Sequence, residues 1–207
     1  MADVTISALS VSTPNKDTAV IPYSDGATTY RTSPAGIVAA SPGTVLQAQQ
    51  GIKLDSTLYE NYTASPAWTN IPGLSAKITP KSTNSRILVM SQVSMNIQYN
   101  HPSFRTTRNG NPVYVNTQPV AGTMGPLYGT AQASFMYQGT LNNNSAPTTA
   151  WFFLDDPQTV SAVTYQVQFI FQSGGEVGRD VGINRAYGIE DNGQQATSNV
   201  VLIEIAG

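Results

Sequence analysis

Apolar and polar side chains alternate along several short stretches of the chain. The clearest alternation spans residues 87–99, where six apolar side chains share one parity and Gln92, Ser94, Asn96 and Gln98 lie on the other. Its apolar members are Ile87, Val89, Val93, Met95, Ile97 and Tyr99. Because successive side chains of a β-strand point to opposite faces, this period of two predicts a half-buried strand. A similar alternation at 163–171 predicts a second strand.

Shorter strand candidates recur along the chain with turn signals between them. They lie at residues 44–47, 57–62, 133–137, 150–154 and 200–205. The run Arg108-Asn109-Gly110-Asn111-Pro112 predicts a tight turn, because Asn-Gly favours hairpin geometry and proline cannot donate to a ladder. No apolar stripe of helical period is longer than two turns. The pattern therefore predicts an all-β antiparallel sandwich or barrel.

The last strand, 200–205, is apolar on both of its faces. Val201, Ile203 and Ile205 share one parity, whereas Val200 and Leu202 lie on the other. The outer face of a strand in a monomeric sandwich is normally polar, so another subunit is expected to cover one face. A loop or the N-terminal arm folded over the strand is the alternative. The residues assigned to a trimer interface are Val200, Leu202 and Glu204.

Residues 1–40 are predicted to form a separate N-terminal arm. Two β-prone runs, 18–23 and 28–32, flank Asp25-Gly26 and predict a small hairpin, while Ser33-Pro34 predicts about one helical turn at 35–40. The apolar residues of the arm are too dispersed to form a core, so we expect them to anchor it to a partner protein. These anchor residues are Val4, Ile6, Leu9, Val20, Ile21 and Tyr23. Residues 41–66 are predicted to be a linker with short strands, and 67–207 the main domain.

Charged residues are scarce and make up 11% of the chain, against about 25% in ordinary soluble proteins. Residues 109–154 contain no charged residue at all. Depletion of charge is typical of surfaces that pack permanently against other protein, although a long neutral loop system would have the same composition.

Several classes of partner are disfavoured by composition. The net charge of -2, with scattered basic residues, gives no electrostatic footprint for nucleic acid. The chain has no cysteine, so it has neither disulfides nor thiolate chemistry. No signal peptide and no run of membrane-spanning length is recognisable, so we expect synthesis in a host cytoplasm without membrane insertion.

Residues that could support chemistry are isolated from one another. His101 is the only histidine and lacks partner motifs, and Gly174–Gly178 has no phosphate-binding signature. Asp155-Asp156 could bind calcium or, more commonly, form a turn before Pro157. Aromatic residues in neutral surroundings could bind a glycan or simply pack in the core: Tyr114, Tyr128, Tyr137 and Tyr187. We therefore expect no catalytic residue, no metal site and no cofactor.

Four segments resemble parts of tailed-bacteriophage fibre-like proteins. They are Trp68–Ser82 with Asn84–Val89, the turn Arg108–Val113, the run Phe153–Pro157 leading into Val163, and the ending Ser198–Gly207. Such proteins are similar to the jelly roll of the tumour-necrosis-factor and C1q class, which assembles as a homotrimer with its last strand near the threefold axis. The start of the chain separately resembles attachment segments of phage tail and fibre proteins.

The resemblance implies a non-enzymatic virion protein with a trimeric jelly roll. One expectation is a short fibre or knob, held to capsid or tail proteins by the arm and contacting a glycan on the host surface. The alternative is a capsid decoration, or cement, protein that stabilises the head shell. A polysaccharide-degrading tailspike is disfavoured because no β-helix repeat is present.

Overall fold

β-Strands account for all the regular secondary structure in the described part of the chain. The computed structural model describes residues 21–24, 29–32, 42–62, 67–97, 102–113, 131–134, 146–171, 179–186 and 195–207. Its strands are β1 Ile21–Ser24, β2 Thr29–Thr32, β3 Val45–Lys53, β4 Thr57–Tyr62, β5 Thr69–Ile78, β6 Arg86–Ile97, β7 Pro102–Arg108, β8 Asn111–Pro112, β9 Ala133–Ser134, β10 Thr148–Asp155, β11 Val163–Phe171, β12 Arg179–Ile183 and β13 Ser198–Ile205.

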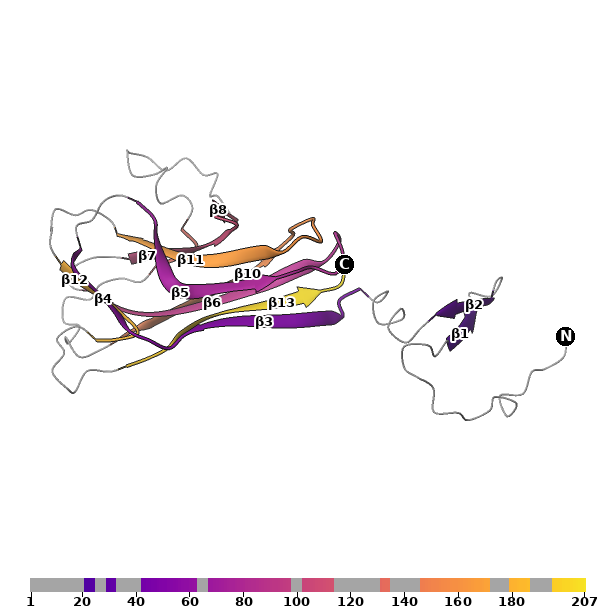
Figure 1. The fold of residues 1–207 in the computed structure, drawn as a ribbon, viewed down its shortest axis with the longest axis horizontal. Coiled ribbons are helices and arrows are strands. Elements are labelled where there is room, and N and C mark those ends of the chain that lie inside the picture. Colours follow the sequence, from indigo (N-terminus) through magenta and orange to yellow (C-terminus); the bar gives the residue numbers. More distant parts are fainter. Residues whose placement is uncertain are drawn as a thin grey trace.

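Two antiparallel sheets stack face to face to form a sandwich (Figure 1). The first, here called the β6 sheet, has the order β3-β13-β6-β12-β4, with β10 also paired to β6. The second, the β11 sheet, has the order β5-β11-β7-β8, with β9 also paired to β7. The last strand lies between β3 and β6, strands far from it in sequence. The predicted all-β jelly-roll sandwich is confirmed.

The core lies between the two sheets and uses the parity expected from the sequence. Ile87, Val89 and Val93 of β6 are fully buried, opposite Tyr165 and Val167 of β11. Trp151 shows how polar groups inside this core are paired. The indole Nε1 of Trp151 donates to Thr106 Oγ1 (3.1 Å) and to Gln132 Oε1 (3.0 Å), and its ring stacks on Phe104 at 5.7 Å between centroids.

The predicted turn between β7 and β8 is confirmed. Asn109 and Gly110 have φ angles of 50° and 83°, the positive values that a tight hairpin requires and that Asn and Gly tolerate best. The amide of Asn109 donates to the carbonyl of Thr164 (2.8 Å), and the Asn109 side chain accepts from the Thr164 amide (2.9 Å). The turn is thereby attached to the start of β11.

One edge of the sandwich closes through a glycine. A Cβ atom on Gly51 of β3 would lie 1.9 Å from the carbonyl oxygen of Ser75 in β5. No other residue allows the two backbones to approach so closely.

Residues 42–62, which fall in the region 41–66 predicted as a linker, are part of the sandwich. β3 pairs with β13 from Val45 to Lys53, and β4 pairs with β12. The prediction failed because Gln47, Gln49 and Gln50 weaken the apolar alternation of β3, an edge strand whose inner face meets only the rim of the core. The chain enters the sandwich beside its end, where Gly43 donates to the Ala206 carbonyl (2.8 Å).

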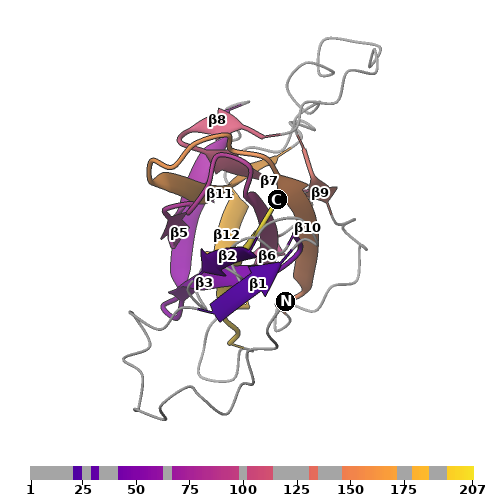
Figure 2. The same ribbon diagram turned by 90° about the vertical axis from the view of Figure 1, so that its right-hand side faces the viewer.

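The predicted hairpin of the arm is present. β1 and β2 form a two-stranded antiparallel sheet, with Tyr23 opposite Tyr30. In Figures 1 and 2 it lies beyond the end of the sandwich that carries the C-terminus and the start of β3. The helical turn expected at 35–40 and the anchor residues Val4, Ile6, Leu9 and Val20 lie outside the described residues. The side chains of Ile21 and Tyr23 do too.

Candidate assembly interface

The three residues predicted to contact other subunits lie inside the sandwich. Val200, Leu202 and Glu204 have no solvent exposure, because they occupy the inner face of β13, which packs against β5. The carboxylate of Glu204 accepts from the backbone amide of Lys81 and from Gln47 Nε2, both at 2.5 Å. The assignment of these residues to an interface is wrong, since the protein's own second sheet already covers them.

The opposite parity of β13 belongs to an apolar surface that crosses four strands. Residues paired in register project to the same face of a sheet. Ile203 is opposite Leu88 of β6, which in turn is opposite Leu154 of β10. Val201, Met90 and Phe152 form the next such row. We call this outer surface of the β6 sheet the apolar face. Its apolar residues are Val45, Ala48, Ile52, Leu88, Met90, Ala150, Phe152, Leu154, Val201, Ile203 and Ile205, and the polar residues Gln50, Gln92 and Asn199 lie among them.

Several members of the apolar face are strongly exposed. The exposed fractions are 77% for Phe152, 60% for Val45, 49% for Ile52 and 43% for Met90. No strand of the described structure packs over this side of the β6 sheet. Large exposed apolar surfaces on a folded domain usually mark an interaction site.

The outer face of the β11 sheet has the opposite character. Its exposed and half-buried residues are Asn70, Ser75, Lys77, Ser103, Arg105, Thr164, Gln166 and Gln168, and the same parity also holds the buried Thr107 and Ile170. Arg105 Nε donates to Gln168 Oε1 (2.6 Å), Gln168 Nε2 donates to Asn70 Oδ1 (2.7 Å), and the guanidinium lies 4.3 Å from the ring centroid of Trp68. Partial burial lowers the pKa of Arg105 below its usual value. Polar side chains linked in this way suit a face that stays in water.

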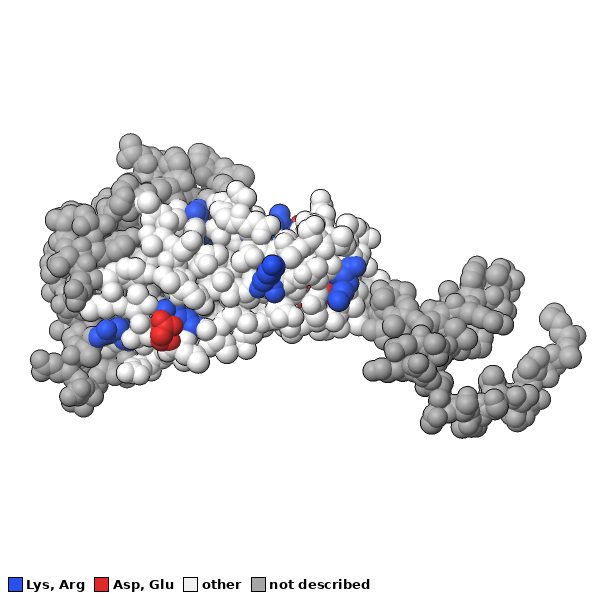
Figure 3. All heavy atoms as spheres, viewed as in Figure 1, with Lys and Arg blue, Asp and Glu red and all other residues white. Residues whose placement is uncertain are grey.

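The outer strands β3 and β10 lack the usual protection of sheet edges. Natural edge strands commonly carry charged side chains that oppose pairing with other chains. The charged residues of these two strands, Lys53 and Asp155, are both buried. Lys53 Nζ contacts Asp55 Oδ2 at 2.7 Å, at the strand's end. Figure 3 shows how few charged side chains lie on the side of the described surface that faces the viewer.

Asp155 links the two sheets and does not form the turn predicted for it. Its carboxylate accepts from Arg108 Nη1 at 3.0 and 2.8 Å and from the Tyr165 hydroxyl at 2.5 Å. Burial, together with this carboxylate, raises the pKa of Tyr165 above its usual value. The acceptor atoms that calcium would need are thus engaged. Within the described ranges, no three His, Asp or Glu side chains gather to hold a metal ion.

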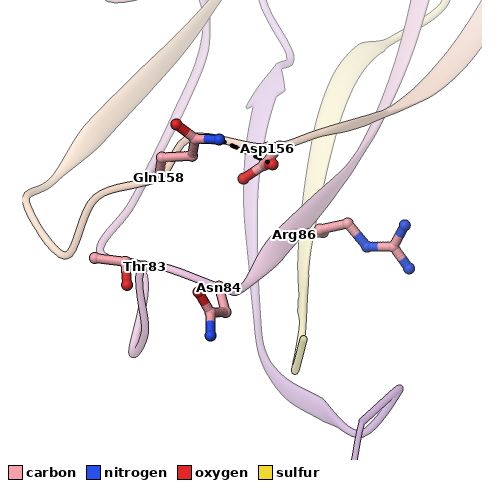
Figure 4. Close-up of a pocket in the computed structure, with 5 residues that line it drawn as sticks. All are labelled: Thr83, Asn84, Arg86, Asp156 and Gln158. Carbon is pink, nitrogen blue, oxygen red and sulfur yellow. Dashed lines mark hydrogen bonds between the residues drawn. The ribbon is translucent and has the colours of Figure 1, made fainter.

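A pocket of about 360 Å³ lies where β6 begins and β10 has just ended. It is lined by Thr83, Asn84, Arg86, Asp156 and Gln158. Figure 4 shows Gln158 hydrogen-bonded to Asp156 (3.4 Å), whereas the guanidinium of Arg86 points away from the other four.

Other candidates from the sequence lie outside the described residues. These are His101, the loop 174–178 and the tyrosines 114, 128, 137 and 187. In the part of the chain that the structure describes, no helix is long and apolar enough to cross a membrane.

Comparisons with known proteins find a distant structural likeness but no family. No protein-family model matches the chain, and no curated protein matches it. Among solved structures, the chain is similar to VP2 in a subviral particle of infectious bursal disease virus, at 12% identity and a TM-score of 0.35. The match covers 91% of this chain and 43% of the VP2 chain, so the chain spans less than half of that protein.

Proposed function

We propose that this chain is a non-enzymatic structural protein of a tailed-phage particle and that it assembles as a homotrimer through the apolar face. The proposed assembly rests on the contrast between the outer face of the β6 sheet and the outer face of the β11 sheet. One is polar and cross-linked by its own hydrogen bonds, and the other exposes Phe152 and Met90. The phage setting and the threefold order rest on the resemblance of the sequence.

A second copy of the same chain is the occupant that fits the apolar face best. The face is nearly free of charge, and so are β3 and β10, the strands at its two flanks. In a closed ring, one flank of each copy packs against the face of the next. Such packing covers the apolar side chains and both unprotected edges at once.

The N-terminal arm is proposed to attach the trimer to capsid or tail proteins. Its hairpin is too small to be stable alone, and it lies at the end of the sandwich where β3 begins (Figure 1). A short fibre or knob that contacts a host glycan and a head-decoration protein both agree with this arrangement. The number of copies per virion separates them, because decoration needs many trimers and a tail attachment few.

Light scattering of the purified full-length chain tests the assembly. We expect a trimer at micromolar concentration, and we expect Phe152→Gln to shift it toward monomer. Val160→Gln is the matched control, since Val160 is 54% exposed but lies outside the apolar face. A wild-type monomer would refute the proposed assembly.

Removal of residues 1–40 tests the attachment. The shortened chain is expected to fold and form trimers but to be absent from purified virions. Normal incorporation of this variant, measured by quantitative mass spectrometry, would show that the arm is not the anchor.

A further inference from the structure

Among the described residues, the apolar face carries a single charged side chain. Arg86 stands at the start of β6, opposite Ile205 and on the outer side of the sheet. It is exposed, and within the described part of the chain it forms no ion pair. If the face is covered by another copy, this guanidinium loses its water and needs an acceptor, because an unpaired buried charge opposes assembly.

We propose that Arg86 forms an ion pair with Asp156 of the neighbouring copy. This inference rests on the proposed assembly and names a contact that holds the copies in register. Arg86 begins β6, Asp156 directly follows the adjacent strand β10, and both residues line the same pocket (Figure 4).

Asp156 is available for such a contact. It follows β10 directly and is exposed, whereas its neighbour Asp155 is buried and engaged by Arg108 and Tyr165. The side chain of Asp156 accepts only a long hydrogen bond of 3.4 Å from Gln158 in the described structure. Its carboxylate therefore retains acceptor capacity for a guanidinium.

Other carboxylates of the described sandwich are poorly placed for Arg86. Glu204 is fully buried and bonded to Lys81 and Gln47. Asp55 follows β3, and Figure 1 shows the end of β3 at the opposite end of the sandwich from the start of β6. The exposed carboxylate on the level of Arg86 is that of Asp156.

The symmetry of the proposed assembly brings Arg86 of one copy to the height of Asp156 in the next copy. Asp155 is opposite Ile87 in the β10–β6 ladder, so Asp156 comes level with Arg86 one residue further along. A ring whose axis runs along the strands keeps each residue at the same height in every copy. It also places all the arms at one end, as attachment to a single surface requires. Arg86 on the face of one copy then meets Asp156 at the β10 flank of the next.

Charge reversal tests the pair. Arg86→Asp and Asp156→Arg should each raise the concentration at which the assembly half-dissociates by at least about tenfold, because like charges then meet. The double variant, which restores opposite charges, should assemble like wild type. Lys77→Asp, on the polar outer face, is the matched control and should have no effect. Circular dichroism of each variant verifies that the sandwich is folded.

Mixing the two single variants shows whether the pair joins different chains. An ion pair between copies predicts partial recovery in the mixture, because the carboxylate introduced by Arg86→Asp in one chain then meets the guanidinium introduced by Asp156→Arg in the other. Recovery in the double variant without recovery in the mixture would place the pair within one chain and overturn the inference. Single variants that assemble like wild type, or reversals that neither route rescues, would overturn it too. A wild-type monomer would instead refute the proposed function.

Discussion

Adjacent residues of β13 should respond to the same substitution in opposite ways. Leu202 is fully buried between the sheets, whereas its neighbour Ile203 is half-buried at the centre of the apolar face. We predict that Leu202→Asp prevents folding of the sandwich. Ile203→Asp should instead leave a folded monomer that no longer assembles.

The magnitudes follow from what each side chain contacts. Truncating a buried leucine to alanine costs about 2–5 kcal/mol, and burying a carboxylate without a partner adds several more. The total for Leu202→Asp is comparable to the whole stability of a domain, about 5–15 kcal/mol. The substitution Ile203→Asp costs the monomer little stability, because this side chain is only half-buried there. In a trimer, three copies would each lose about 1.5–3 kcal/mol of burial, which is enough to dissociate the assembly at micromolar concentration.

Circular dichroism, thermal unfolding and light scattering separate the two outcomes. Val160→Asp is the control for adding a carboxylate at an exposed apolar position outside the face. A folded Leu202→Asp monomer, together with an Ile203→Asp variant that still assembles, would show that the two sides of β13 have been assigned the wrong way round. An unfolded Ile203→Asp variant would show that the outer side is part of the core.

Three further predictions concern the sandwich itself. Asp155→Asn should lower the free energy of unfolding by about 2–3 kcal/mol in urea denaturation, because Arg108 loses its charged partner but keeps 32% of its side chain exposed. The raised pKa of Tyr165 favours the neutral phenol in the folded state, so its stabilising effect is complete below the usual value of 10.0 and declines as pH rises above it. Unfolding titrations between about pH 9 and 11 should therefore show a steeper loss of stability for wild type than for Tyr165→Phe. Gly51→Ala should cost about 1–3 kcal/mol in thermal unfolding, because the new methyl group would lie 1.9 Å from the Ser75 carbonyl.

The fold could be predicted from the sequence wherever a strand has one solvent-exposed face and one buried face. The alternation at 87–99 correctly predicted the buried side chains of Ile87, Val89, Val93 and Met95, although Ser94 and Asn96 on the other parity are buried as well. The side chain of Ile97 and the whole of Tyr99 lie outside the described residues. Asn109-Gly110 correctly predicted the β7–β8 turn. β3 was harder to recognise because its glutamines hide the period of two. Its place in the sheet depends on pairing with β13, more than a hundred residues away, which no local pattern records.

The alternation of residues could not predict which face of the last strand, β13, is buried. When both faces of a strand are apolar, alternation cannot tell which face meets the core. The choice is made by pairing with β6, whose inner residues Ile87 and Val89 lie on the same side as Val200 and Leu202. Leu88 and Met90, which break the polar parity of β6, were the signal in the sequence that its outer face is also apolar.

The scarcity of charge then has a structural explanation that composition alone could not supply. The charged groups of the β6 and β11 sheets are largely placed where they bind the protein to itself. Asp155 joins Arg108 and Tyr165 across the sandwich, Glu204 holds the loop at Lys81, and Arg105 spans the outer polar face. The outer side of the β6 sheet carries apolar side chains, the uncharged polar residues Gln50, Gln92 and Asn199, and one arginine at its end. A chain that stays monomeric would be expected to carry more charge on that surface, so a polar substitution at Ile203 or Phe152 should favour the monomer.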